Sequence, residues 1–350
     1  MESTPPFKEE APVSLAVVVH AAGDLRLDPA EPGKLGPRDA LVAVEYGGIC
    51  GSDLHYVKHG AAGLSILREP MVLGHEVAGR IAGLGSEVTG FEVGQAVTIH
   101  PATVCGECEF CTSGRPNLCE SVRYLGSAAY HPHTEGAFAG LSVIPARQLR
   151  AVPDGVSTRL AAVAEPLGVA IHAVNRAGSV AGKTVLVNGA GPIGVLVVAA
   201  ARKAGAARVV ASDLAAGSLD VARRMGAHDV VNLAEGGELP ATDVVFEASG
   251  APPAVTSVLR AVKRGGIVVQ VGNLPAGKLE VSLAELVFRE IDYRGTFRFV
   301  DEISTALEYL ADGLDVEPIL THEFPVEEAA EAFRVAGDRS TGSSKVLLKF

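Results

Sequence analysis

The strongest constraint on the fold is a regular alternation of strand-like and helix-like patterns that begins near Ser157. Six apolar runs are predicted as strands: KTVLVNG, ARVVASD, HDVVNLA, TDVVFEASG, GIVVQVG and DYRGTF. Helix patterns between them cover residues 192–204, 217–225 and 253–263. A strand, a helix and a further strand at this spacing make a parallel crossover, so this part of the chain is predicted to be α/β with a doubly wound parallel sheet.

A different pattern fills roughly the first 155 residues. Short β-branched runs are broken there by Gly and Pro: SLAVVVH, ALVAVEYGG, HEVAGRIAGLG, QAVTIHPA and GLSVIPARQLRAV. This pattern is typical of an antiparallel β domain with few helices. Near the C-terminus, residues 301–311 and 326–336 are predicted as helices and SSKVLLKF as a closing strand. Because an isolated strand needs a sheet edge, we expect that strand to return to the first domain.

Composition and charge exclude several classes of protein. The 350 residues amount to about two domains, at roughly 100–200 residues each. A formal charge of −11 repels phosphate backbones, so nucleic acid is not an expected partner. The chain has no basic leader segment and no apolar run of about 18 residues, so we expect no membrane contact and a cytoplasmic location.

A glycine fingerprint stands directly after the first strand of the alternating region. Gly189, Gly191 and Gly194 form GxGxxG where a strand ends and a helix opens, with Pro192 and Ile193 between them. Such a loop permits a tight turn, lets a pyrophosphate approach the backbone and lets the helix pack closely on the strand.

An acidic residue completes this fingerprint. Asp213 ends the next strand, 24 residues after Gly189, where its carboxylate can accept hydrogen bonds from ribose hydroxyls. No Arg follows to hold a 2′-phosphate, so NAD is favoured over NADP. The alternatives are a glycine turn that binds no ligand and a site for another adenine-containing ligand.

Four of the five cysteines have the spacing C-x2-C-x2-C-x7-C: Cys105, Cys108, Cys111 and Cys119. Four thiolates close a tetrahedral shell around Zn²⁺ and leave no open position, so the predicted site is structural. An iron–sulfur cluster and a nucleic-acid-reading zinc module are the alternatives. The first lacks other electron-relay features, and the acidic charge argues against the second.

The fifth cysteine, Cys50, is predicted to belong to a second metal site. Twenty-five residues later the chain supplies His75 and Glu76, and Glu165 follows just before the alternating region. A thiolate, an imidazole and a carboxylate leave a fourth position of zinc open, as catalysis requires. Taken singly, Cys50 could be an inert thiol, His75 a core histidine and Glu165 a helix cap.

These segments together resemble a known family, the zinc-containing medium-chain dehydrogenases/reductases. GICGSDLHY, GHEVAG, the four-cysteine spacing, AEP, GAGPIG and the acid after the second strand occur in the family's order, from about Val17 to Phe350. The resemblance implies a GroES-like catalytic domain over residues 1–157, a Rossmann dinucleotide-binding domain over 158–298 and a C-terminal return to the catalytic domain over 299–350. It also implies a catalytic zinc near Cys50, His75 and Glu76 and a structural zinc at the four-cysteine segment.

Within the family the chain is similar to the polyol branch. Glu165 stands where alcohol dehydrogenases carry a second zinc-binding Cys, and YLGSAAYHPHTEGAF and RGTFRF resemble the members that oxidise L-idonate. Threonine dehydrogenases share the architecture but typically carry Thr where Ser52 stands. Glu76 and Glu165 cannot be ranked as the third zinc ligand from sequence. The resemblance implies a small polyol or sugar-acid substrate, NAD, two zinc ions per chain and a homo-oligomer, either tetramer or dimer.

The remaining site residues follow from these expectations. Ser52 is placed to take the hydroxyl proton of the substrate and His55 to pass it to solvent, although they could be a turn residue and a surface histidine. Substrate and cofactor contacts are assigned as follows: Tyr56, Glu165 and Arg298 to substrate; Val271, Phe297 and Arg298 to cofactor. Arg298 could equally face solvent. His131 and His133 are interpreted as solvated or substrate-lining side chains. A binding protein with an inactive site is the alternative from another class.

Overall fold

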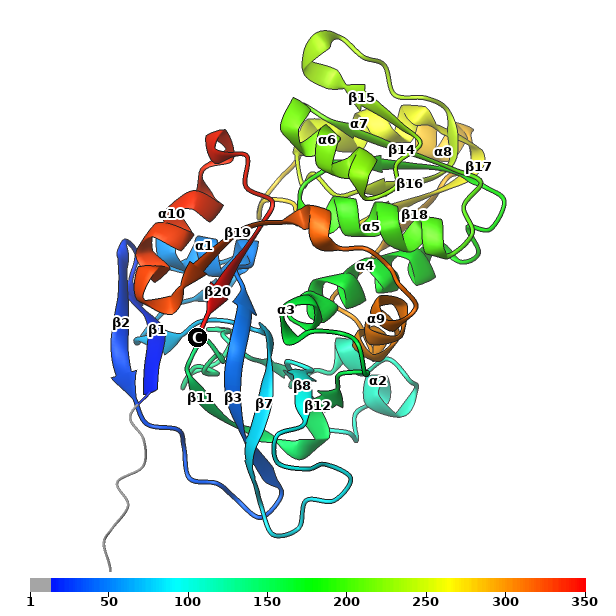
Figure 1. Ribbon diagram of the computed structural model, residues 1–350. Coiled ribbons are helices and arrows are strands. Elements are labelled where there is room, and N and C mark those ends of the chain that lie inside the picture. Colours follow the sequence, from blue (N-terminus) through cyan, green and yellow to red (C-terminus); the bar gives the residue numbers. More distant parts are fainter. Residues whose placement is uncertain (1–13) are drawn as a thin grey trace, which may run out of the picture.

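Two sheets organise the computed structural model, which describes residues 14–350. A seven-stranded sheet forms the centre of one part, and a six-stranded sheet flanked by helices forms the centre of the other (Figure 1). Within residues 14–350 no helix is both long and apolar enough to span a bilayer.

The seven-stranded sheet has the order β12-β8-β7-β3-β20-β19, and β11 also pairs with β3. Its strands are β3 (Asp39–Gly48), β7 (Glu76–Leu84), β8 (Ala96–Ile99), β11 (Leu141–Pro145), β12 (Leu149–Ala151), β19 (Leu320–Pro325) and β20 (Lys345–Lys349). Alternate residues of β3, such as Ala40, Val42 and Val44, are buried, because successive side chains of a strand point to opposite faces. Strand β20 runs antiparallel to β3, so the predicted pairing of the closing strand with the N-terminal sheet is confirmed.

Smaller elements surround this sheet. The strands are β1 (Ser14–Ala21), β2 (Asp24–Ala30), β4 (Ala61–Ala62), β5 (Ser65–Ile66), β6 (Met71–Val72), β9 (Ala102–Thr103) and β10 (Arg123–Tyr124). The helices and turns are α1 (Gly51–His59), α2 (Glu109–Thr112), η1 (Pro116–Leu118), η2 (Ala146–Gln148), α3 (Thr158–Ala161), η4 (Glu317–Ile319), η5 (Val326–Glu328), α10 (Ala329–Gly337) and η6 (Arg339–Thr341). Helix α10 packs against β19 and β20.

The six-stranded sheet is entirely parallel, with the order β15-β14-β13-β16-β17-β18. Its strands are β13 (Thr184–Asn188), β14 (Arg208–Asp213), β15 (Asp229–Asn232), β16 (Thr242–Glu247), β17 (Val262–Gln270) and β18 (Asp292–Gly295). In chain order these are strands three, two, one, four, five and six of the domain, so the direction of winding reverses between β13 and β16. In such a sheet, ligands bind at the carboxyl ends of the strands beside the reversal.

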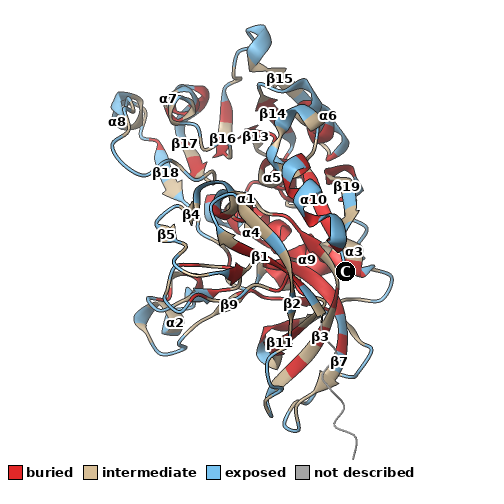
Figure 2. Cartoon of the chain, turned by 90° about the vertical axis from the view of Figure 1, so that its left-hand side faces the viewer, coloured by how far each residue is buried: buried red, intermediate tan, exposed pale blue. Residues whose placement is uncertain are grey.

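Helices cover both faces of the parallel sheet, as the predicted fold class requires. They are α4 (Ala164–Ala177), α5 (Pro192–Lys203), α6 (Ala216–Arg224), η3 (Leu233–Glu235), α7 (Pro252–Ala261), α8 (Ala284–Phe288) and α9 (Glu302–Ala311). Helices α4, α5, α6 and α9 share one apolar core, and α7 packs in a separate core on the opposite face. Helix α4 is buried along most of its length and also contacts β7 of the other sheet (Figure 2).

The predicted helices of this region are observed with small shifts at their ends. The helix expected over residues 253–263 ends at Ala261, because Val262 already begins β17, so its last two residues were assigned wrongly. In the segment 326–336, a 3₁₀ turn precedes α10. Helices α1 and α4 and the short helices α2, α3 and α8 were not predicted.

Candidate active site and metal sites

Three side chains form the centre of the site: Cys50, His75 and Glu76. Their ligand atoms all lie within 4.8 Å of one another, and His75 and Glu76 are buried. Cys50 precedes α1, whereas His75 and Glu76 stand at the start of β7, and Gly48 of β3 pairs directly with Glu76. A Cβ on Gly48 would lie 2.4 Å from Oε2 of Glu76, so only glycine leaves room for this carboxylate against the strand.

Asp53, which was missed by the sequence reasoning, holds Cys50 and His75 in position. It is fully buried, and its carboxylate accepts hydrogen bonds from the backbone N–H of Cys50, at 3.0 Å, and of Gly74, at 3.4 Å. One of its oxygens lies 3.8 Å from Nδ1 of His75. Burial raises the pKa of Asp53. A carboxylate behind a histidine is the arrangement that orients metal-binding imidazoles.

Lys345 of β20 holds Glu76. Its Nζ lies 2.9 Å from Oε1 and 2.7 Å from Oε2 of Glu76, and 3.2 Å from the carbonyl oxygen of Ile49. Both charged side chains are almost completely buried. Although burial acts to lower the pKa of Lys345, Glu76 outweighs it and raises that pKa, so the ammonium stays charged at neutral pH. The C-terminal strand therefore supplies the counter-charge for a residue 269 positions earlier in the chain.

Glu165 lies outside the three-residue group, in a second cluster beside it. It stands in the first turn of α4, and its Oε1 accepts a 2.5 Å hydrogen bond from the hydroxyl of Tyr124. The Tyr124 ring meets the His75 ring edge-on at a centroid distance of 5.6 Å. Burial raises the pKa of Glu165 to about 7. The sequence reasoning assigned no role to Tyr124, because a lone tyrosine at the end of a two-residue strand carries no pattern.

Arg298 completes this second cluster from the segment between β18 and α9. Its guanidinium carbon lies 4.1 Å from the centroid of the Tyr124 ring and 4.7 Å from that of Phe297. Its Nη1 is buried with no hydrogen-bond partner among residues 14–350, and its backbone has a φ of 52°, in the left-handed region. A strained residue with an orphaned donor is a common mark of a ligand-binding position.

The other predicted catalytic and substrate residues lie along α1. Ser52 and His55 are three positions apart, so they share one side of the helix, and His55 is exposed. Tyr56 is only 2% exposed, and its hydroxyl accepts a hydrogen bond from the backbone N–H of Ala128 at 3.0 Å. Its ring therefore belongs to the N-terminal apolar core.

The four remaining cysteines lie together on the segment that carries α2 and η1. Sγ of Cys105 lies 3.5 Å from that of Cys119 and 3.9 Å from that of Cys111. Thiolates bound to one tetrahedral zinc at about 2.3 Å lie about 3.8 Å apart, so the cluster fits that ion. Hydrogen bonds from the backbone N–H of Glu107 and Cys108 help to lower the pKa of Cys105 to about 6, which favours the thiolate.

A third group of metal-binding residue types, Glu69, His131 and His133, also comes together. Both ring nitrogens of His133 are engaged: Nε2 accepts a hydrogen bond from the N–H of Arg68 at 2.9 Å, and Nδ1 lies 2.7 Å from the carbonyl oxygen of Tyr130. No lone pair of this ring is free for a cation, so the group does not have the character of a metal site.

The glycine fingerprint lies at the carboxyl end of β13, next to the reversal of the sheet. Gly189 has a φ of 96°, and Gly191 is the N-cap of α5, which opens with Pro192 and Ile193. A Cβ on Gly194 would lie 1.8 Å from the carbonyl oxygen of Gly189, so helix and loop can be this close only with glycine.

The other predicted cofactor residues lie at the ends of neighbouring strands. Asp213 ends β14, and its carboxylate accepts hydrogen bonds from the N–H of Ala190 at 2.7 Å and of Ala215 at 2.9 Å. Val271 follows β17, and Phe297, half exposed, follows β18. All of these positions surround the carboxyl edge of the sheet.

Comparisons with known proteins agree with this architecture. Residues 36–154 match the alcohol dehydrogenase GroES-like domain, and residues 192–312 match the zinc-binding dehydrogenase domain. The chain therefore belongs to the zinc-binding dehydrogenases, and the predicted membership in the zinc-containing medium-chain family is confirmed.

Individual relatives show that the chain is similar to the polyol branch of this family. The chain is 40% identical to L-idonate 5-dehydrogenase (NAD(P)(+)) of Escherichia coli K12 over 320 residues, which cover 89% of this chain and 91% of that protein. It is 34% identical to sorbitol dehydrogenase of Bacillus subtilis 168, over 95% of this chain and 96% of that protein. The crystal structure of the E. coli L-idonate enzyme superposes with a TM-score of 0.89, at 37% identity, and covers 96% of this chain and 98% of that one.

Proposed function

We propose that the protein oxidises a secondary alcohol of a polyol or sugar acid with NAD⁺, and that L-idonate, converted to 5-keto-D-gluconate, is the substrate. Relatives named L-idonate 5-dehydrogenase and sorbitol dehydrogenase support this substrate class. The observation that carries the proposal is the group of half-buried Cys50 and buried His75 and Glu76, which lies beside the Tyr124–Glu165 pair.

The donor set of this group fits a catalytic zinc. One thiolate, one imidazole and one carboxylate are the ligands of an open tetrahedral site, and their ligand atoms all lie within 4.8 Å of one another. We assign Cys50, His75 and Glu76 as the ligands, because Glu165 lies outside the group and is held by Tyr124. Zinc supplies Lewis acidity, which lowers the pKa of a bound alcohol toward neutrality. Cys105, Cys108, Cys111 and Cys119 would hold the structural ion.

The chain's own residues then bind and orient the substrate and move its proton. Ser52 would take the hydroxyl proton as it gives its own proton up toward His55, which is exposed on the same side of α1 and would release a proton to solvent. Bound NAD⁺ would supply the hydride acceptor. The orphaned Nη1 of Arg298 is available for a hydroxyl or carboxylate of the substrate.

NAD⁺ is the proposed cofactor. The Gly189–Gly194 loop and the N-terminus of α5 would hold the pyrophosphate, and Val271 and Phe297 would contact the nicotinamide end. Asp213 supports NAD⁺ over NADP⁺, because a carboxylate repels a 2′-phosphate.

We also propose the division of the chain into residues 1–157, 158–298 and 299–350, and a homo-oligomeric state, tetramer or dimer. Strand β18 is an edge strand of the parallel sheet as described, and Val287 and Phe288 next to it are 69% and 78% exposed. Exposed apolar side chains beside an open edge support pairing with a second copy. The cytoplasmic location remains a prediction.

Initial rates test the function directly. The full-length protein is assayed with L-idonate, sorbitol, xylitol and L-threonine, each with NAD⁺ and with NADP⁺, and L-idonate with NAD⁺ is expected to give the highest kcat/KM. Activity confined to L-threonine would contradict the polyol class, and a higher kcat/KM with sorbitol would move the assignment to sorbitol dehydrogenase. Zinc bound without turnover of any alcohol would favour an inactive binding protein.

Metal analysis tests the ligand assignment. The protein should contain two zinc ions per chain, and Cys50→Ala and Glu76→Gln should each lose one ion and the activity. Glu165→Gln should keep both ions, and loss of zinc from this variant with retention in Glu76→Gln would reverse the assignment of the two carboxylates.

A further inference from the structure

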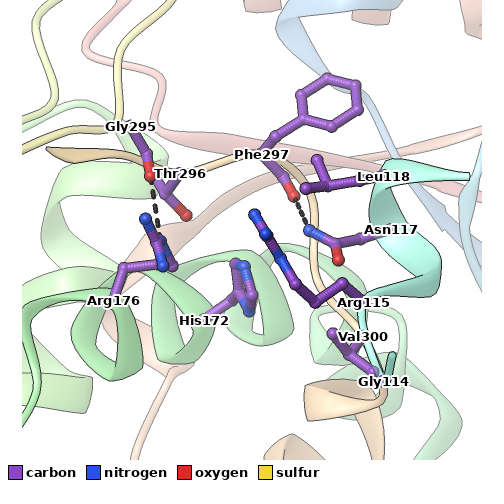
Figure 3. A pocket seen from close by; sticks show the side chains of 10 residues that line it. All are labelled: Gly114, Arg115, Asn117, Leu118, His172, Arg176, Gly295, Thr296, Phe297 and Val300. Carbon is purple, nitrogen blue, oxygen red and sulfur yellow. Dashed lines mark hydrogen bonds between the residues drawn. The ribbon is translucent and has the colours of Figure 1, made fainter. Parts of the chain in front are cut away.

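A surface pocket of about 470 Å³ lies apart from the proposed zinc ligands and the glycine loop. Its walls come from three places in the chain: the four-cysteine segment around η1, the C-terminal half of α4, and residues 295–300 (Figure 3). A volume of this size matches the pockets that hold small metabolites.

Cationic side chains from two of these walls face the same space. In Figure 3, Arg115 from the η1 segment and Arg176 from α4 flank His172, and all three are directed into the pocket. Neither arginine has a carboxylate within 4 Å in residues 14–350. Arg176 donates only through Nε, to the carbonyl oxygen of Gly295 at 3.0 Å, and Arg115 lies over the ring of Phe110 at 6.0 Å.

Unsatisfied groups add to this donor set. Oγ1 of Thr296, a pocket residue, is buried and has no hydrogen-bond partner within the described residues. His172 is 8% exposed; its Nδ1 donates to Glu302 at 2.8 Å, and its Nε2 has no partner in the described residues. A buried polar atom without a partner, such as Oγ1 of Thr296, is uncommon in proteins and marks a place where a ligand or water belongs.

Among residues 14–350, no carboxylate side chain lines the pocket. Glu302 contacts the lining from behind: it bonds to His172 at 2.8 Å and also accepts from the N–H of Val300 at 2.7 Å and from Asn175 at 3.1 Å. Although burial acts against it, the hydrogen bond from His172 holds the pKa of Glu302 at about 2, so this acid stays ionised. The two arginines give the pocket a local excess of positive charge, although the net charge of the chain is −11.

We propose that this pocket is a binding site for a small metabolite that carries a phosphate or carboxylate group. The guanidinium groups of Arg115 and Arg176 bind the anion, because two forks of N–H donors match the oxygens of either group. Thr296 and His172 contribute a hydroxyl and a ring nitrogen. No zinc ligand and no fingerprint glycine lines this pocket, and Phe297 is the lining residue that it shares with the proposed cofactor site.

The occupant would touch the segment that leads to the active site. Residues 295–297 form one wall, and Arg298, the next residue, has a left-handed backbone and stacks on Tyr124. The carbonyl oxygen of Phe297 already accepts a hydrogen bond from Asn117 of the η1 segment at 2.9 Å. An anion held by both walls therefore couples to the position of Arg298, and the KM for the alcohol substrate should respond to it.

Calorimetric titration of the full-length zinc-loaded protein tests the site. The titrants are inorganic phosphate, citrate and glucose 6-phosphate at constant ionic strength, with saturating NAD⁺ present and no alcohol, so that the pyrophosphate site is filled. Arg115→Gln removes an exposed cation and should weaken binding of the preferred titrant at least tenfold, and Arg115→Gln combined with Arg176→Gln should abolish it. Arg224→Gln, an exposed arginine on α6 with no ion-pair partner in the described chain, is the matched control and should bind within twofold of wild type.

The outcomes separate this inference from the proposed function. The preferred titrant identifies the anion: phosphate-bearing if phosphate or glucose 6-phosphate binds, carboxylate-bearing if only citrate binds. Absence of binding, or equal binding by wild type and the double variant, overturns the site while the dehydrogenase assay stands. Coupling is tested by measuring the KM for the alcohol with and without the anion. The anion should shift this KM at least twofold in wild type and in Arg224→Gln but not in Arg115→Gln. Binding without that shift overturns the coupling.

Discussion

The buried pair of Lys345 and Glu76 allows a quantitative test of how the site is held. The two side chains are 3% and 1% exposed, and Nζ lies within 2.9 Å of both carboxylate oxygens. Lys345→Met keeps similar bulk but leaves the Glu76 charge buried without its partner. Removal of one member of such a pair costs about 3–5 kcal/mol, so the free energy of unfolding of the zinc-free protein should fall by about that amount.

Bound zinc should reduce this loss. If Glu76 is a zinc ligand, the dication compensates its charge, and we expect the loss in the zinc-loaded protein to be less than about half of that in the zinc-free protein. The double variant Lys345→Met, Glu76→Gln removes both charges, so it should recover most of the stability without zinc.

Urea unfolding followed by circular dichroism, with chelator and with excess zinc, measures these differences. Lys349→Met is the matched control, because Lys349 lies on the same strand but is exposed, and its free energy of unfolding should stay within about 0.5 kcal/mol of wild type. If the free energies of unfolding of Lys345→Met and Lys349→Met differ by less than about 1 kcal/mol without zinc, the Lys345–Glu76 pair behaves as an exposed ion pair and the reasoning is refuted. Equal losses with and without zinc would refute Glu76 as a ligand.

The remaining predictions concern the cofactor loop and the structural ion. Gly191→Ala should fold normally, because its Cβ meets no atom within 4 Å, yet NAD⁺ binding measured by fluorescence titration should weaken about tenfold; unchanged binding would place the pyrophosphate elsewhere. Gly194→Ala should instead lower the melting temperature, since its Cβ would lie 1.8 Å from the carbonyl oxygen of Gly189. Cys111→Ser should lose one zinc by metal analysis and also melt earlier, whereas retention of both ions would remove Cys111 from the shell. Asp213→Ser should shift the ratio of kcat/KM toward NADP⁺ by about tenfold, and no shift would contradict the carboxylate argument.

The parallel sheet was predictable because each strand and helix there carries its own local pattern. Helix α5, for example, opens at Pro192 after a glycine N-cap, and both signals are visible in sequence. Helix α4 was missed because Pro166 and Gly168, both poor helix formers, stand near its start. Helix α1 was missed because it has only nine residues and its N-cap is Cys50, which is not a usual N-cap residue.

The site was predictable only where residue type and spacing carry the chemistry. Cys50, His75 and Glu76 were expected near one ion, and the structure brings them together. Asp53 and Lys345 were not found, because their roles depend on contacts that exist only after folding: one acid reaches back from the first turn of α1, and the lysine arrives on the C-terminal strand. Sequence periodicity holds no information on such pairings.

The question that sequence left open, which of two carboxylates joins the metal, is addressed by their different partners. Glu76 is compensated by a buried ammonium, and a carboxylate has lone pairs enough to accept from Lys345 and still bind a cation. Glu165 instead accepts from a neutral phenol, and burial raises its pKa to about 7. Its partner Tyr124 is stacked on Arg298, the residue with an orphaned donor. The two acids therefore have separate environments. The surroundings of Glu76 keep its charge beside the thiolate and imidazole, whereas Glu165 contacts the side chains that we assign to the substrate.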